Sequence, residues 1–103
     1  MSAAKKPSIL VVEDEAIIAE DLRDALVSLG YRVTEIAGTA EEAMRAASHE
    51  CPSLALLDIR IRGKLDGIEL AHMLRAQFRT PVVFLTAHAD DQTLSRAKLA
   101  EPY

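Results

Sequence analysis

The sequence predicts an α/β protein built on a parallel sheet with helices on both faces. Short aliphatic runs alternate along the chain with segments whose apolar residues recur at helical spacing, and this alternation is typical of parallel sheets. Three of these runs end in polar groups, which are Glu13 and Asp14 after the first, Asp58 after the third and Thr86 after the fourth. Ligands of open parallel sheets bind at the carboxyl ends of the strands, so the expected fold and the polar residues indicate the same edge.

The first half of the chain contains two predicted strands and two predicted helices. Ile9–Val12 is an unbroken aliphatic run, as in a strand buried on both faces. The following helix starts near Ala16 and ends at Gly30, and we expect one face of it to be formed by Ile18, Leu22, Ala25, Leu26 and Leu29. The alternating segment Arg32–Ile36 predicts the second strand. The helix after it should turn Ala40, Ala43, Met44 and Ala47 inward.

Thr39 followed by Glu42, and Asp66 followed by Glu69, are capping-box patterns that predict the starts of the second and third helices. Pro52 precedes a strand over Leu54–Leu57, and Pro81 precedes a strand over Val82–Leu85. The third helix should bury Leu70, Ala71, Leu74 and Phe78. A weaker fourth helix is expected from Asp90 or Asp91 through Leu94 and Ala97.

Size and composition restrict the class of protein further. A chain of 103 residues forms one domain at most. Its net charge of −4 argues against a nucleic-acid-binding surface, and its single cysteine, Cys51, excludes an intrachain disulfide or a thiolate metal cluster. No signal peptide or membrane-spanning run is evident, so we expect a cytoplasmic protein without a membrane partner. Residues 1–7 should form a flexible N-terminal segment.

The acidic groups at the strand ends favour metal and phosphoryl chemistry. Carboxylates that lie close together repel one another, and a divalent cation removes that conflict. Mg²⁺ is commonly bound by one or two carboxylates together with waters and a phosphate oxygen. Asp14 and Asp58 are therefore the candidate carboxylate ligands. Glu13 could hold a metal-bound water, and the backbone carbonyl of Arg60 could be a further ligand. Asp58 could also attack phosphorus as a nucleophile, and Thr86 could donate a hydrogen bond to the phosphoryl group.

Four segments in this order resemble the receiver domain of two-component response regulators: VVEDE, LALLDIR, LDGIEL and PVVFLTAHAD. The resemblance extends from Ile9 to Tyr103. It implies a three-layer α/β/α flavodoxin-like doubly wound sheet with strand order 2-1-3-4-5. It also implies a signalling protein rather than a turnover enzyme.

The family resemblance assigns a role to each residue of the predicted site. Asp58 would accept a phosphoryl group from the phosphohistidine of a histidine kinase or phosphotransfer protein, in a reaction that depends on Mg²⁺. Glu13 and Asp14 would be the acidic pair around the cation, and Thr86 would be the switch hydroxyl. Phosphorylation would then shift an existing equilibrium between two conformations and change the contacts made with partners.

The chain also departs from the family pattern. The loop after Asp58 carries no proline, and the family's fifth strand, its lysine and its fifth helix would all follow Tyr103. We therefore interpret residues 8–103 as a receiver domain that is incomplete at its C-terminal end. Such a chain should be a fragment of a longer protein, or a homodimer through the apolar edge of the Val82–Leu85 strand or the face of the fourth helix.

Other interpretations remain open at this point. A receiver-like interaction module that is not regulated by phosphate is the alternative function. A phosphatase with an aspartyl nucleophile is disfavoured, because Arg60 occupies the position of its usual second aspartate. Glu13-Asp14 alone could be a solvated helix start, Thr86 an ordinary loop hydroxyl, and His88 either a group that tunes phosphoryl lifetime or an exposed loop residue.

Overall fold

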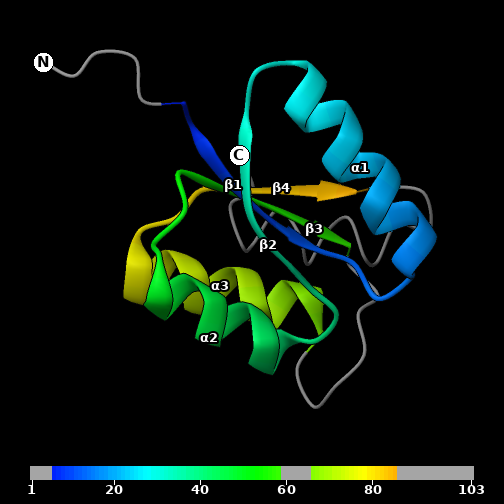
Figure 1. The fold of residues 1–103 in the computed structure, drawn as a ribbon. Coiled ribbons are helices and arrows are strands. Elements are labelled where there is room, and N and C mark those ends of the chain that lie inside the picture. Colours follow the sequence, from blue (N-terminus) through cyan, green and yellow to red (C-terminus); the bar gives the residue numbers. More distant parts are fainter. Residues whose placement is uncertain (1–5, 59–65, 86–103) are drawn as a thin grey trace, which may run out of the picture.

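The computed structural model describes residues 6–58 and 66–85, in which four strands and three helices alternate (Figure 1). The strands are β1 (Ser8–Val12), β2 (Arg32–Ala37), β3 (Leu54–Asp58) and β4 (Val82–Leu85). The helices are α1 (Ala16–Ser28), α2 (Ala40–His49) and α3 (Gly67–Phe78). The helix predicted from Asp90 or Asp91 lies outside the described residues.

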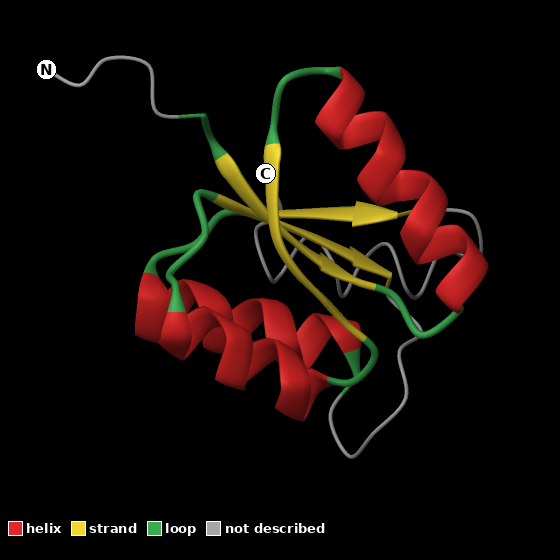
Figure 2. Ribbon diagram, in the orientation of Figure 1, coloured by secondary structure: helices red, strands yellow, loops and turns green. Residues whose placement is uncertain are grey.

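The four strands form one parallel sheet in the order β2-β1-β3-β4, which confirms the predicted fold class. Figure 2 shows α2 and α3 together on one face of this sheet and α1 on the other. The order reverses direction next to β1, because the chain passes from β1 outward to β2 and then returns to the other side of β1 to form β3. In doubly wound sheets this switch point is where ligands bind.

The main hydrophobic core lies between the sheet and the pair of helices α2 and α3. Short alanine side chains on α2 allow that helix to approach the sheet closely, while larger leucines fill the space under α3. The buried side chains of this core are Leu10, Val12, Ala37, Ala40, Ala43, Ala46, Ala47, Ala55, Leu57, Ile68, Leu70, Ala71, Leu74 and Val82. The inward faces predicted for both helices are confirmed, with Met44 and Phe78 packed at the margin.

The inward face predicted for α1 is only partly correct. Ala19 is the buried residue of this helix, and Leu22 and Leu26 are half-buried. Ile18, Ala25 and Leu29, which we expected on the same face, are exposed. The reason is geometric. In the described part of the chain the contacts of α1 are mainly with β1 and β2, so the stripe directly over the sheet is the part of the helix that is covered.

The helix ends follow the local sequence. Gly30 has a φ of 96° directly after α1, a conformation that glycine adopts without strain. At α3 the Asp66 side chain accepts from the backbone N–H of Glu69, and the Glu69 side chain accepts from the backbone N–H of Asp66, which confirms the predicted capping box. Thr39 likewise accepts from the N–H of Glu42 at 3.1 Å. These caps fix where α2 and α3 start, next to the carboxyl edge of the sheet.

Candidate functional site

The register of the sheet brings the acidic residues of two separate segments to the same level. Val12 of β1 is paired with Leu57 of β3, so the residues that follow them, Glu13 and Asp58, emerge side by side at the carboxyl edge. Asp14 is one residue further along the β1–α1 loop. The edge predicted from the sequence is therefore the edge at which the structure gathers these side chains.

The three carboxylates form a compact cluster. One oxygen from each of Glu13, Asp14 and Asp58 lies within 4.8 Å of the others. Glu13 is buried, with 4% of its surface exposed, whereas Asp14 and Asp58 are half-buried. Part of the cluster therefore opens toward solvent, where a cation or a phosphoryl donor could reach it.

The Glu13 carboxyl group has an unusual protonation equilibrium. Its pKa is raised from 4.5 to about 7, mainly by burial and also by the negative charge of Asp58 and by hydrogen bonds with the side chains of Asp14 and Asp58. The backbone N–H of Glu15 donates to Glu13 Oε2 at 3.1 Å and acts in the opposite direction. The net effect is a buried acid that retains its proton until near neutral pH when no cation is present.

The donor set of this cluster fits a hard divalent cation. Carboxylate oxygens are the protein ligands that Mg²⁺ prefers, and the mutual repulsion of the three acids is the electrostatic conflict that a cation relieves. Asp14 and Asp58 would be its carboxylate ligands, with Glu13 beside them. Clusters of exposed acids are common without metals, so the burial of Glu13 and its raised pKa are the observations that distinguish this one.

Backbone hydrogen bonds hold the loop that carries Glu13 and Asp14. The N–H of Glu13 donates to the carbonyl of Ala37 at 2.9 Å and so extends the pairing of β1 with β2 by one residue. Sequence analysis did not identify Ala37 or the N–H of Glu15 as parts of the site. The register of the strands and the path of the loop show that these backbone groups support the site. The sequence does not indicate this, because every residue has the same backbone groups whatever its side chain.

Three predicted site residues cannot be placed by the structure. Thr86, Arg60 and His88 lie outside the described residues. Leu85, the last residue of β4, is paired with Asp58. Thr86 is the next residue in the sequence after Leu85.

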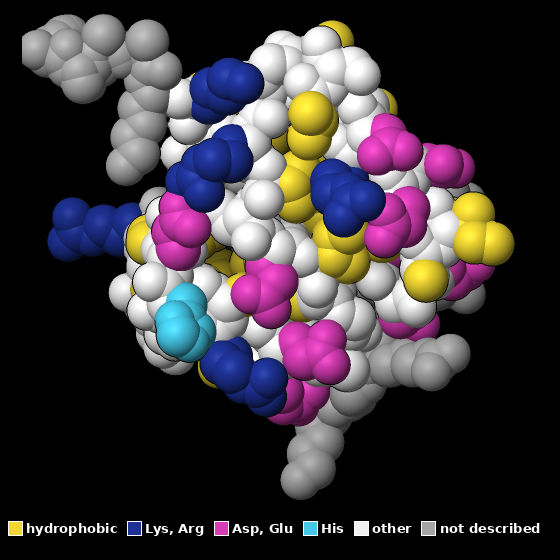
Figure 3. Space-filling model, in the orientation of Figure 1, with side chains coloured by type: hydrophobic (Ala, Val, Ile, Leu, Met, Phe, Trp, Pro, Cys, Tyr) yellow, Lys and Arg dark blue, Asp and Glu magenta, His cyan; other side chains and the backbone are white. Residues whose placement is uncertain are grey.

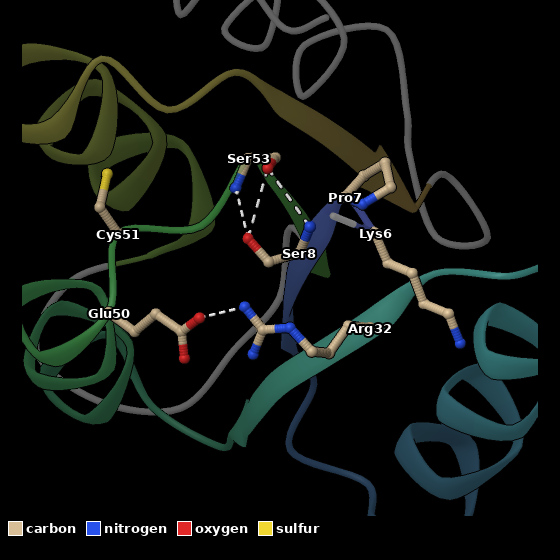
Figure 4. A pocket seen from close by; sticks show the side chains of 7 residues that line it. All are labelled: Lys6, Pro7, Ser8, Arg32, Glu50, Cys51 and Ser53. Atoms are coloured by element: carbon tan, nitrogen blue, oxygen red, sulfur yellow. Dashed lines mark hydrogen bonds and ion pairs between the residues drawn. The ribbon is translucent and has the colours of Figure 1, made fainter. Parts of the chain in front are cut away.

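A hollow of about 520 Å³ lies at the opposite, amino-terminal edge of the sheet (Figure 4). It is lined by Lys6, Pro7, Ser8, Arg32, Glu50, Cys51 and Ser53. The guanidinium of Arg32 is engaged in an ion pair with Glu50. The Ser8 and Ser53 side chains each accept a hydrogen bond from the other residue's backbone N–H. Arg32 and Glu50, and Ser8 and Ser53, therefore satisfy one another, and the hollow is a weaker candidate than the acidic cluster.

The surface around α1 combines acidic and apolar side chains. Figure 3 shows Asp and Glu side chains over this helix with isolated hydrophobic side chains among them. Ile17, which follows the Glu13–Glu15 acids closely in sequence, is 79% exposed. Among the described residues, no helix has the length and apolar character that crossing a lipid bilayer requires.

Fold and site together define an α/β protein with an acidic cluster at the switch point of a doubly wound sheet. Comparison with known proteins then identifies the family. The sequence profile described as the response regulator receiver domain matches residues 9–101, and the chain belongs to this family. Receiver domains of response regulators are signalling proteins and not turnover enzymes.

Individual relatives support the assignment. The chain is 35% identical over 91 residues to the phyllosphere-induced regulator PhyR of Methylorubrum extorquens, which covers 87% of this chain and 34% of that protein. It is 33% identical over 96 residues to the transcriptional regulatory protein PdtaR of Mycobacterium tuberculosis, which covers 93% of this chain and 46% of that protein. The chain thus spans less than half the length of these curated relatives.

Solved structures agree with the fold. The signal receiver domain of a modulated diguanylate cyclase from Desulfovibrio desulfuricans G20 superimposes with a TM-score of 0.89 at 42% identity, over 95% of this chain and 78% of that one. The receiver domain of PhyR from Erythrobacter litoralis superimposes with a TM-score of 0.72 at 34% identity, over 77% of this chain and 61% of that one.

Proposed function

We propose that this chain is a phosphorelay receiver in which Asp58 accepts a phosphoryl group from a histidine kinase or phosphotransfer protein, in a reaction that requires Mg²⁺ or a similar divalent cation. The observation that carries the proposal is the convergence of Glu13, Asp14 and Asp58 within 4.8 Å at the switch point of the sheet. Phosphorylation would change the contacts that the domain makes with its partners.

The chemistry needs a nucleophile and a way to offset negative charge. In the proposed step an Asp58 oxygen attacks phosphorus, the P–N bond of the donor phosphohistidine breaks, and the imidazole leaves with the electron pair and takes up a proton. Asp58 is suited to this role because it is half-buried and lies at the end of a rigid strand. A bound divalent cation supplies charge neutralisation at the phosphoryl oxygens. Asp14 would hold that cation, and Glu13 would hold one of its waters.

Two further roles rest on sequence position. Thr86 follows Leu85, the residue paired with Asp58, and would donate its hydroxyl hydrogen to a phosphoryl oxygen. The backbone carbonyl of Arg60, two residues after Asp58, would be an additional cation ligand.

The proposal is tested by incubating the purified chain with Mg²⁺ and a small phosphodonor and measuring its intact mass. We expect a gain of one phosphoryl group that is absent in Asp58→Asn and greatly slowed in Asp14→Asn or when Mg²⁺ is chelated. Glu41→Gln, which removes an exposed carboxylate on α2, should be phosphorylated as fast as the unmodified chain. A chain that is folded and binds Mg²⁺ but gains no phosphoryl group would favour the alternative function, a receiver-like interaction module that does not depend on phosphorylation.

A further inference from the structure

The turn between β2 and α2 packs against the loop that carries the acidic pair. The N–H of Glu13 donates to the carbonyl of Ala37, the last residue of β2, at 2.9 Å. The next residue, Gly38, is so close to Asp14 that a Cβ atom on the glycine would lie 3.9 Å from the Asp14 Cα. The peptide group between Ala37 and Gly38 therefore joins this turn to the loop that carries Asp14, through its bond to the N–H of Glu13.

The side chain of Glu42 holds the turn in place. Its Oε1 accepts a hydrogen bond from the backbone N–H of Gly38 at 2.8 Å, while its own N–H donates to the Thr39 side chain. In an ordinary capping box the glutamate accepts from the N-cap residue itself, as Glu69 does at α3, where it accepts from the N–H of Asp66. At α2 the glutamate extends one residue beyond the N-cap, to the N–H of the peptide group whose carbonyl accepts from Glu13.

We infer that Glu42 is a positioning residue for the acidic cluster, which fixes the loop of Glu13 and Asp14 by holding the Ala37–Gly38 peptide group that accepts from the N–H of Glu13. The inference deepens the proposed function and rests on it for its consequence in cation binding. Glu42 does not belong to the cluster of three carboxylates, so it acts through Gly38 and not as a ligand.

The hydrogen bond from Gly38 to Glu42 can position the loop because Glu42 belongs to a firmly packed helix. Glu42 is anchored on the first turn of α2, where Ala40 and Ala43 are fully buried against the sheet. Its bond to Gly38 is charge-assisted, which makes it shorter and stronger than a bond between neutral groups. A cation site depends on ligands that are fixed before the ion arrives, and partners outside the ligand set alter metal affinity when they are removed.

The test compares Glu42→Ala and Glu42→Gln with Glu41→Gln in the full 103-residue chain. Glutamine removes the charge at position 42 but keeps an oxygen that accepts from Gly38, whereas alanine removes the bond. Glu41→Gln is the matched control, since it deletes an exposed carboxylate from the same helical turn without a bond to the β2–α2 turn.

The first measurement uses the metal-free protein and amide hydrogen exchange. In Glu42→Ala we expect faster exchange at the N–H groups of Gly38 and Glu13, relative to the N–H of Ala55, which is bonded to Pro81 in the sheet and reports global unfolding. Glu41→Gln should exchange as the unmodified chain does, and Glu42→Gln, which keeps a weaker bond, should lie between it and Glu42→Ala. Unchanged exchange at Glu13 in Glu42→Ala, or equal effects of alanine and glutamine, would overturn the inference.

The second measurement is the dissociation constant for Mg²⁺. We expect it to rise about two- to fivefold in Glu42→Ala compared with Glu42→Gln, which corresponds to the loss of one hydrogen bond of about 0.5–1 kcal/mol. A lower melting temperature with an unchanged dissociation constant would show a purely structural role and overturn the inference. Failure of the unmodified chain to bind Mg²⁺ would instead contradict the proposed function, while the exchange data would still decide whether Glu42 holds the loop.

Discussion

Glu13 and Asp58 lie at the ends of adjacent parallel strands with carboxylate oxygens within 4.8 Å of each other, and Glu13 is almost completely buried. The position of Glu13 one residue past the Val12–Leu57 pair explains this contact. Two acids at this separation cannot both be ionised without a cost unless a cation is present. The stability of the domain should therefore depend on pH and on divalent cations.

The pH dependence follows from the raised pKa of Glu13, which is about 7 in the folded protein and 4.5 ordinarily. The folded state binds this proton more tightly than the unfolded state, so the contribution of Glu13 to stability is complete below pH 4.5 and is lost as the pH rises through 7. We expect the free energy of unfolding of the metal-free protein to decrease over this range by up to about 3 kcal/mol from this group.

Chemical denaturation at several pH values, with a chelator present, measures this effect. Glu13→Gln should remove most of the decrease, because the amide does not ionise. Glu41→Gln should retain it. Equal slopes for the unmodified chain and Glu13→Gln would show that Glu13 does not hold its proton as the structure indicates.

Mg²⁺ should stabilise the folded protein through the same cluster. A ligand that binds only the folded state at one hundred times its dissociation constant adds about 2.7 kcal/mol to the free energy of unfolding. The increase should be larger at pH 8 than at pH 5, because the cation competes with the Glu13 proton. Thermal unfolding with and without Mg²⁺ measures this stabilisation. Asp14→Asn should abolish most of it. If Mg²⁺ stabilised Asp14→Asn as strongly as the unmodified chain, Asp14 would be excluded as a ligand.

Leu57 should be essential to the stability of the fold. Its side chain is fully buried between β3 and the helices α2 and α3, so Leu57→Ala should lower the free energy of unfolding by about 2–5 kcal/mol. Ile17→Ala, at a position that is 79% exposed, should change it by less than about 0.5 kcal/mol. Urea denaturation compares the two variants, and a similar cost for both would contradict the packing described above.

The serine pair at the amino-terminal edge should stabilise the protein without affecting the site. The N–H of Ser8 donates to Ser53 Oγ at 3.2 Å, and the N–H of Ser53 donates to Ser8 Oγ at 3.1 Å, which joins the start of β1 to the residue before β3 (Figure 4). Ser8→Ala should cost about 0.5–1.5 kcal/mol, because the Ser53 N–H loses its bond to Ser8 Oγ but keeps its 2.8 Å bond to the Ser8 carbonyl.

The same variant tests the separation of the two edges of the sheet. Because the acidic cluster lies at the opposite end of the strands, Ser8→Ala should leave the Mg²⁺ dissociation constant within about twofold of its original value, where twofold corresponds to roughly 0.4 kcal/mol. A double-mutant cycle with Ser53→Ala would measure the coupling between the two residues. A large change in cation affinity would mean that the edges are not independent.

The elements that the sequence predicted correctly are those with strong local patterns. Val82–Leu85 was predicted at its observed bounds because an aliphatic run follows a proline and ends at a hydroxyl residue. The α3 start was predicted because the Asp66–Glu69 pattern makes its hydrogen bonds within one turn. The inward faces of α2 and α3 were predicted because both helices contact the sheet and each other, so their burial follows helical periodicity.

The features that were missed depend on contacts between distant segments. The burial of Ala19 in place of a leucine-rich face on α1 reflects the contacts of this helix, which among the described residues are mainly with β1 and β2. The register of β1 against β2 shifts between Ile9 and Leu10, and no local pattern indicates such an irregularity. The extension of Glu42 past the N-cap to Gly38 depends on the path of the β2–α2 turn, which the capping pattern alone does not specify.

The order of residues by itself determined that strands and helices would alternate, and that oxygen-bearing side chains would follow the strands, because period and capping are local properties. Only the tertiary structure decided that Glu13, Asp14 and Asp58 share one cluster and that Glu13 is its buried member. Those outcomes require β1 and β3 to be neighbours in a particular register, and this register is set by the packing of side chains that lie far apart in the chain.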